Sequence, residues 1–169
     1  MEEKILTPLF SYIVRYMTRT HRVLPEKILN RYIEGILEKQ PVFLDSAMRF
    51  NTPLYFYDET ALIGQIREFR EIFNRHFNRF RTFYAMKSNS HIDLCKKAVE
   101  NGAGLDVSSG MELTKALSVR CDKIIFSGPG KTNEELELAI KNRDRVTIMM
   151  DSYGELNRIV TLLNRNSSG

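Results

Sequence analysis

Lys87 is the residue whose type and position could perform covalent chemistry. It is the last residue of the apolar and aromatic run 82–87, Thr-Phe-Tyr-Ala-Met-Lys, which predicts a buried strand. Alternation along a strand places Ala85 and Lys87 on one face, and the small side chain of Ala85 leaves space there. A lysine removed from water can lose its proton and form a Schiff base with a carbonyl group. The alternative is that Lys87 is exposed where the strand ends.

An acidic residue follows in the next strand-like run, 104–108. Alternation within this run places Asp106 on the face that is expected to carry Lys87 in the neighbouring strand. A carboxylate near a lysine ammonium attracts it and could hold it in place. Ser109, with Glu112 three residues later, has the pattern of a helix capping box. That pattern explains Ser109 and Glu112 structurally and leaves Asp106 unexplained.

The run 127–132, Ser-Gly-Pro-Gly-Lys-Thr, resembles the end of a phosphate-binding loop. The first glycine of such a loop should lie five residues before Gly130, where this chain has Ile125 inside a strand. We therefore predict no nucleoside triphosphate site, and expect Thr132 or Asn133 to cap the next helix. No metal site is predicted, since the three histidines have no metal-ligand spacing: His21, His76 and His91.

Four strand–helix units, spaced by about 20 residues, must position these side chains. The expected strands cover 82–87, 104–108, 123–127 and 146–151, and the expected helices cover 92–100, 111–118, 133–141 and 153–163. This alternation predicts an α/β fold with a parallel sheet and right-handed crossovers. A small doubly wound sheet is the alternative, but the loop after the first strand lacks its glycines. A complete TIM barrel takes about 250 residues, so we expect the N-terminal half of one.

The segment before these units is predicted to have a different structure. Residues 1–50 are expected to be helical and irregular, with one amphipathic helix that begins at Pro25 and ends near Gln40-Pro41. An aromatic strand is expected over 52–58, and then a long helix with apolar residues on one face.

Composition excludes several classes of protein. Among 169 residues, Lys and Arg number 25 and Asp and Glu 21, a formal net charge of +4. Because Glu68 and Glu71 interrupt the five arginines between Arg67 and Arg81, we expect a solvated helix face there and no nucleic-acid partner. No apolar run reaches the roughly 18 residues of a membrane helix, and the N-terminus lacks the order of a signal peptide. With two cysteines and no CxxC motif, the chain is predicted to be cytoplasmic.

Four motifs in order resemble the fold-type III pyridoxal-phosphate decarboxylases. The motifs are Thr-Pro-Leu-Tyr-Phe-Tyr-Asp at 52–58, Phe-Tyr-Ala-Met-Lys-Ser-Asn at 83–89, the run 102–113, and Phe-Ser-Gly-Pro-Gly-Lys-Thr at 126–132. Within this family the motifs are most similar to diaminopimelate decarboxylases, and ornithine and arginine decarboxylases are relatives. The resemblance implies a barrel of the alanine racemase type over 59–169, a strand of a second β-domain at 51–58, and a separate helical extension at 1–50.

The resemblance also implies a cofactor and roles for individual residues. Lys87 falls on the Schiff-base lysine that holds pyridoxal 5′-phosphate. Ala85 falls on the small residue that lies against the cofactor ring, and Asp106 falls on an acidic position at the mouth of the barrel. The implied reaction is decarboxylation of a basic or diamino amino acid, with diaminopimelate to lysine favoured, by an enzyme that is a homodimer at full length.

The family places further parts after the last residue of this chain, namely a histidine, a glycine-rich phosphate loop and a glutamate. We therefore expect an N-terminal fragment that cannot complete catalysis alone. Two alternatives stay open. One is a non-catalytic half-barrel or regulatory relative that binds a partner chain. The other is a pyridoxal-phosphate-binding protein or amino-acid racemase of the same fold type.

Overall fold

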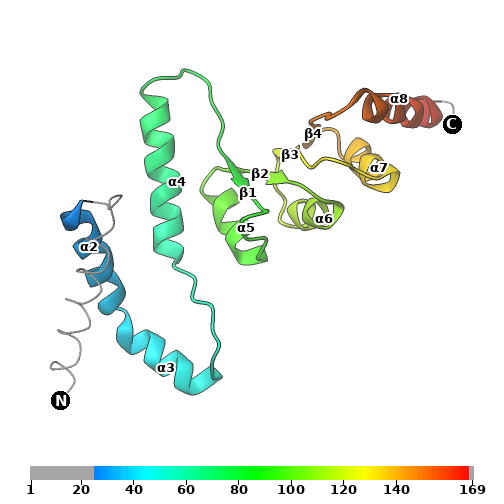
Figure 1. Cartoon of the computed structure of the whole chain (residues 1–169). Coiled ribbons are helices and arrows are strands. Elements are labelled where there is room, and N and C mark those ends of the chain that lie inside the picture. The colour runs from blue at the N-terminus through cyan, green and yellow to red at the C-terminus, as the bar shows by residue number, and fades with distance from the viewer. Residues whose placement is uncertain (1–24, 168–169) are drawn as a thin grey trace, which may run out of the picture. The chain divides into compact units, whose positions relative to one another are not determined.

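The structure is a computed structural model that describes residues 25–167. The chain divides into two compact units, Met1–Tyr57 and Asp58–Gly169 (Figure 1). The described elements of the first unit are the helices α2 (Glu26–Leu37) and α3 (Gln40–Phe50). Those of the second unit are α4 (Glu59–Asn74), β1 (Phe83–Ala85), α5 (Ile92–Glu100), β2 (Gly104–Val107), α6 (Gly110–Ser118), β3 (Ile124–Phe126), α7 (Asn133–Lys141), β4 (Val146–Ile148) and α8 (Tyr153–Ser167).

The described part of the first unit contains two helices, whereas the sequence predicted one. The amphipathic helix that was expected after Pro25 forms as α2, with Leu29 buried. We predicted an end near Gln40-Pro41, and the helix ends at Leu37, three residues before Gln40; Pro41 itself lies in the first turn of α3. Proline is accepted there, because the backbone N–H groups of a first turn have no partner within the helix.

The strand predicted over 52–58 is not formed. The segment between α3 and α4 runs without sheet pairing, Tyr55 is fully exposed, and the Phe56 ring packs against the Phe43 ring at a centroid distance of 4.7 Å. A strand is stable only when its backbone groups pair with another strand, and the described part of this unit contains no other strand. The aromatic composition was therefore not sufficient to form a strand here.

The second unit has the predicted α/β fold. Its four strands form one parallel sheet in the order β1-β2-β3-β4. A sheet of consecutive parallel strands with right-handed crossovers carries all its connecting helices on one face. In Figure 1, helices α5, α6 and α7 lie on the same side of the sheet. In the register of the sheet, Ala85 lies beside Asp106, and Asp106 lies beside Ile125.

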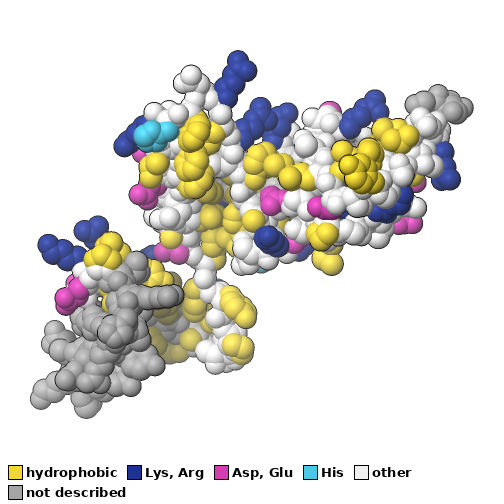
Figure 2. Space-filling view, turned by 45° about the horizontal axis from the view of Figure 1, so that its top comes forward, with side chains coloured by type: hydrophobic (Ala, Val, Ile, Leu, Met, Phe, Trp, Pro, Cys, Tyr) yellow, Lys and Arg dark blue, Asp and Glu magenta, His cyan; other side chains and the backbone are white. Residues whose placement is uncertain are grey.

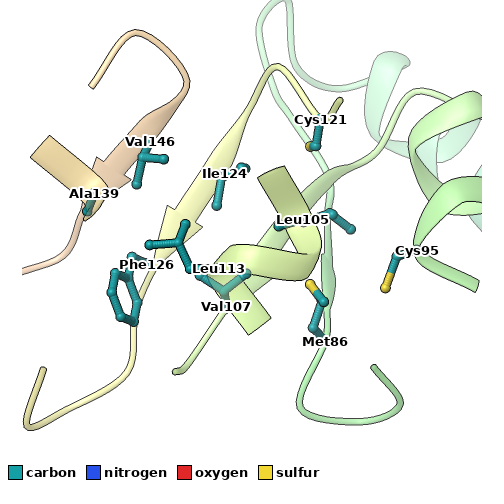
Figure 3. Packing of buried hydrophobic residues seen from close by; sticks show 11 residues of the cluster. Met86, Cys95, Leu105, Val107, Leu113, Cys121, Ile124, Phe126, Ala139 and Val146 are labelled. Carbon is teal, nitrogen blue, oxygen red and sulfur yellow. The ribbon is translucent and has the colours of Figure 1, made fainter. Parts of the chain in front are cut away.

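The hydrophobic core fills the space between the sheet and these helices. Alternate strand residues point into it, as Figure 3 shows for Leu105 and Val107 of β2 and for Ile124 and Phe126 of β3. All four are 0–1% exposed. The intervening strand residues point to the other face of the sheet. That face is less buried, and it carries Asp106.

Apolar side chains stay exposed on this unit (Figure 2). A groove of about 600 Å³ lies between α4 and β1, and Ile66, Phe69 and Phe83 are among its lining residues. No helix within residues 25–167 combines the length and apolarity needed to cross a bilayer.

Candidate functional site

Lys87 lies in a tight turn directly after β1. We predicted it as the last residue of the strand, but pairing ends two residues earlier, at Ala85. The turn is held by hydrogen bonds: the Ser88 hydroxyl donates to the Ala85 carbonyl at 2.7 Å, and the Tyr84 hydroxyl donates to the Asn89 carbonyl at 2.9 Å. Lys87 is therefore exposed at the carboxyl edge of the sheet, the edge at which all four parallel strands end.

Asp106 lies beside this turn but forms no ion pair with Lys87. The backbone N–H of Met86 donates to the Asp106 carbonyl at 2.9 Å, which joins the turn to β2. Asp106 Oδ1 accepts a hydrogen bond from the Ser127 hydroxyl at 2.5 Å. Among residues 25–167, no carboxylate oxygen lies within 4 Å of Lys87 Nζ. The structure thus brings the two residues to one edge, and the predicted attraction between their charges is not realised as a contact.

Ala85 completes the set of predicted site residues. It is half-buried in β1 and lies in register with Asp106. Next to this pair, Gly104 lies in register with Phe83. A Cβ atom at Gly104 would stand 2.5 Å from the Phe83 ring, so glycine is required for the two strands to pack. On the face of the sheet that carries Asp106, Ala85 and Gly104 are small, whereas Phe83 and Ile125 are large.

Lys131 is a buried cation that no sequence motif assigned to a site. It is 2% exposed, and its Nζ lies 3.0 Å from Glu155 Oε1 and 3.2 Å from Asp151 Oδ2. The same Nζ donates to the Met149 carbonyl at 2.7 Å and stands 5.3 Å from the centre of the Phe126 ring. These contacts tie the loop after β3 to the loop after β4. The run 127–132 does not match a phosphate-binding loop, and no other sequence pattern indicated that Lys131 links these two loops.

Carboxylates at the third position of helices α6 and α7 brace the loops of the carboxyl edge. Glu112 accepts from the Ser108 N–H at 2.7 Å. Glu135 accepts from the N–H groups of Thr132 at 2.9 Å and of Gly110 at 2.5 Å, so it joins two loops. The predicted cap at Thr132 is confirmed, with a complete capping box. Such bonds satisfy N–H groups at the helix starts and hold the loops in fixed positions.

The predicted cap at Ser109 is confirmed as well. The Ser109 hydroxyl accepts from the Glu112 N–H at 3.3 Å. The Glu112 side chain returns to the residue before the cap, Ser108, and not to Ser109 itself. The capping box over these residues is therefore present in a shifted form.

The two cysteines supply no nucleophile at this edge. Cys95 is 0% and Cys121 1% exposed, both in the core. Burial raises the pKa of the Cys95 thiol and of the Cys121 thiol, which favours the unreactive protonated form. The carboxyl edge therefore offers an exposed primary amine at Lys87 and a hydrogen-bonded carboxylate at Asp106. This pair suits the covalent capture of an aldehyde or ketone.

Comparison with known proteins identifies relatives of the chain. Two diaminopimelate decarboxylases are similar to the chain. That of Methanothermobacter thermautotrophicus is 30% identical over 118 residues, which is 69% of this chain and 27% of the relative. That of Neisseria meningitidis serogroup B is 36% identical over 115 residues, 67% of this chain and 27% of the relative.

A solved structure of a diaminopimelate decarboxylase is also similar to the chain. The diaminopimelate decarboxylase of Helicobacter pylori, complexed with L-lysine, superimposes with a TM-score of 0.64 at 27% identity, over 74% of this chain and 32% of that one. The chain thus spans about a quarter to a third of the length of these proteins. Residues 63–167 match the pyridoxal binding domain of pyridoxal-dependent decarboxylases. The chain belongs to this family.

Proposed function

We propose that this chain carries the pyridoxal-phosphate-binding part of an amino-acid decarboxylase, with Lys87 as the Schiff-base lysine. The observation that carries the proposal is the position of Lys87. Within a region that matches a pyridoxal binding domain, it presents an exposed amine at the carboxyl edge of a parallel sheet, and no carboxylate of residues 25–167 pairs with it. In β/α barrels this edge carries the catalytic residues.

The residues present fit the cofactor. An amine free of ion pairs can bond covalently to the cofactor's aldehyde carbon, and Lys87 meets this requirement among the described residues. Ala85 would leave room for the flat cofactor ring, because its side chain is a single methyl group. Asp106 would place a negative charge near the bound amine, since its backbone carbonyl already holds the turn that carries Lys87.

Pyridoxal phosphate, when bound, supplies an electron sink that stabilises the negative charge left on the α-carbon after carbon dioxide departs. The contribution of this chain is to bind and orient. The turn hydrogen bonds from Ser88 and Tyr84 restrict the backbone at Lys87, and the braced loops keep Asp106 and its neighbours in place. Orientation of this kind lowers the entropic part of a reaction barrier.

A basic or diamino amino acid is the substrate class we propose, and diaminopimelate is the first choice. The relatives at 30% and 36% identity are diaminopimelate decarboxylases, and the Helicobacter pylori enzyme was solved with L-lysine bound. Asp106 is a carboxylate that could attract a cationic group of such a substrate.

The first test is the visible absorption spectrum of the purified chain with added pyridoxal phosphate. We expect a Schiff-base band that borohydride abolishes, and after reduction a peptide carrying the cofactor at Lys87. Lys87→Ala should remove the band. Lys141→Ala, which changes an exposed lysine at the end of α7, should keep it. A band that persists in Lys87→Ala, or cofactor recovered on other lysines, would overturn the assignment.

A second test separates catalysis from binding alone. Carbon dioxide release is measured with meso-diaminopimelate, ornithine and arginine in turn. Release from meso-diaminopimelate above the other two supports the proposed substrate. Preference for ornithine or arginine refutes that substrate within the same reaction. Cofactor attachment at Lys87 without release from any of the three would show binding without catalysis by this chain, a result that both the cofactor-binding part of an enzyme and a non-catalytic half-barrel would give.

A further inference from the structure

We propose that Ser127 is a positioning residue that fixes the carboxylate of Asp106 at the candidate active site. This inference rests on the proposed function. Ser127 follows β3, and its hydroxyl reaches across to β2, where it donates to Asp106 Oδ1 at 2.5 Å. A hydrogen bond from a hydroxyl to a carboxylate is short and strong compared with one between neutral groups. No feature of the sequence pattern pointed to this bond.

The backbone around Ser127 is held tightly, so its hydroxyl has a fixed origin. The N–H of Ser127 donates to the Val107 carbonyl at 2.9 Å and extends the pairing of β3 with β2. The next residue, Gly128, passes directly over the backbone of Ser108. A Cβ atom at Gly128 would lie 1.9 Å from the Ser108 carbonyl oxygen, closer than any side chain can approach. Glycine there lets the loop after β3 cross the loop after β2, which places Ser127 beside Asp106.

The bond leaves Asp106 with one oxygen engaged and one available. Within the described part of the chain, Oδ2 has no hydrogen-bond or ion-pair partner. The backbone carbonyl of Asp106 holds the N–H of Met86, the residue before Lys87. Hydrogen bonds therefore link three consecutive strand ends, from Ser127 through Asp106 to the turn of Lys87. With Oδ1 fixed by Ser127, Oδ2 is held ready to accept from a protonated amine at this site.

The test uses Ser127→Ala, with Ser127→Thr as the variant that keeps the hydroxyl. Ser118→Ala is the matched control, because Ser118 donates to the Lys115 carbonyl at the far end of α6. The first readout needs no cofactor: nuclear magnetic resonance couplings that report the χ1 rotamer of Asp106. We expect one rotamer in the wild type and Ser118→Ala, averaged couplings in Ser127→Ala, and recovery in Ser127→Thr. Unchanged couplings in Ser127→Ala would overturn the proposal.

The second readout is the dissociation constant for pyridoxal phosphate, taken from the absorption band. We expect it to rise about tenfold in Ser127→Ala, the usual effect of losing one hydrogen bond to a charged group. Equal affinity in the two chains, with averaged couplings in the variant, would refute an effect on the cofactor. Absence of the band in the wild type would refute the proposed function instead, while the couplings would still decide whether Ser127 fixes Asp106.

Discussion

The buried ion cluster around Lys131 allows a prediction with a defined size. Replacing Lys131 with methionine keeps most of the side-chain volume and removes the charge. It leaves Glu155, which is 2% exposed, as a buried carboxylate without its cation at 3.0 Å. At an effective dielectric constant of 20, two unit charges at this distance attract by about 5.5 kcal/mol. Desolvation of the lysine offsets part of this, so we expect a net loss near the 3–5 kcal/mol typical of a broken buried pair.

Asp151 should contribute less to this loss. Its side chain is 44% exposed, so water can solvate its carboxylate after Lys131 is replaced. The Met149 carbonyl, which accepts from Lys131 Nζ at 2.7 Å, also loses a charged donor. The predicted loss is large beside the roughly 5–15 kcal/mol total stability of a typical domain. Glu155→Gln is therefore the milder second variant, because it keeps the shape and removes the opposite charge.

Urea unfolding at 25 °C, followed by circular dichroism, measures the effect. Lys96→Met is the matched control, because Lys96 pairs with Asp93 at 3.6 Å on an exposed helix face. Its loss should be at most about 1 kcal/mol. The double variant Lys131→Met with Glu155→Leu should regain most of the lost stability, since no charge is left buried. A loss in Lys131→Met no larger than in the control would refute the argument that burial makes this pair strong.

Two further predictions concern glycines and thiols. Gly128→Ala should lower the free energy of unfolding by several kcal/mol or prevent folding, because its Cβ would overlap the Ser108 carbonyl. In the same urea assay, Gly35→Ala in α2 should raise the free energy of unfolding by up to about 1 kcal/mol, since nothing lies within 4 Å of its added Cβ. Because burial raises the pKa of Cys95 and Cys121, their contribution to stability is complete below the unfolded thiol pKa of about 8.5 and declines as the pH rises above it. Urea unfolding from pH 7 to 10 should therefore show a steeper decline in the wild type than in the Cys95→Ala/Cys121→Ala chain, and equal slopes would contradict this.

The sequence predicted those features that depend on residues close together in the chain. Alternation in 104–108 placed Asp106 on the face that it shares with Gly104 and Ser108, and its neighbours Leu105 and Val107 are buried in the core on the opposite face. The caps at Ser109 and Thr132 were also predictable, because a helix cap involves residues that are only three apart in the chain.

The features that the sequence did not predict depend on contacts between distant segments. The aromatic run at 52–58 has the composition of a strand, but composition cannot supply the partner that a strand needs. The end of β1 is set by pairing with β2, so Lys87 falls in a turn although its run continues the strand pattern. The ion pair of Lys131 was not predicted, because its partner Glu155 lies 24 residues away, beyond a helix and a strand.

The carboxyl edge shows how local caps produce a long-range framework. Each cap residue is explained locally, and the glutamates then reach beyond their own helix: Glu135 binds the N–H of Gly110, and Glu155 binds Lys131. Because such bonds join neighbouring loops, the edge that carries Lys87 and Asp106 is held by side chains that would not themselves touch a ligand. A substitution such as Glu135→Ala should therefore disturb Asp106 less than Ser127→Ala does, since Glu135 restrains the loop and Ser127 contacts the carboxylate itself.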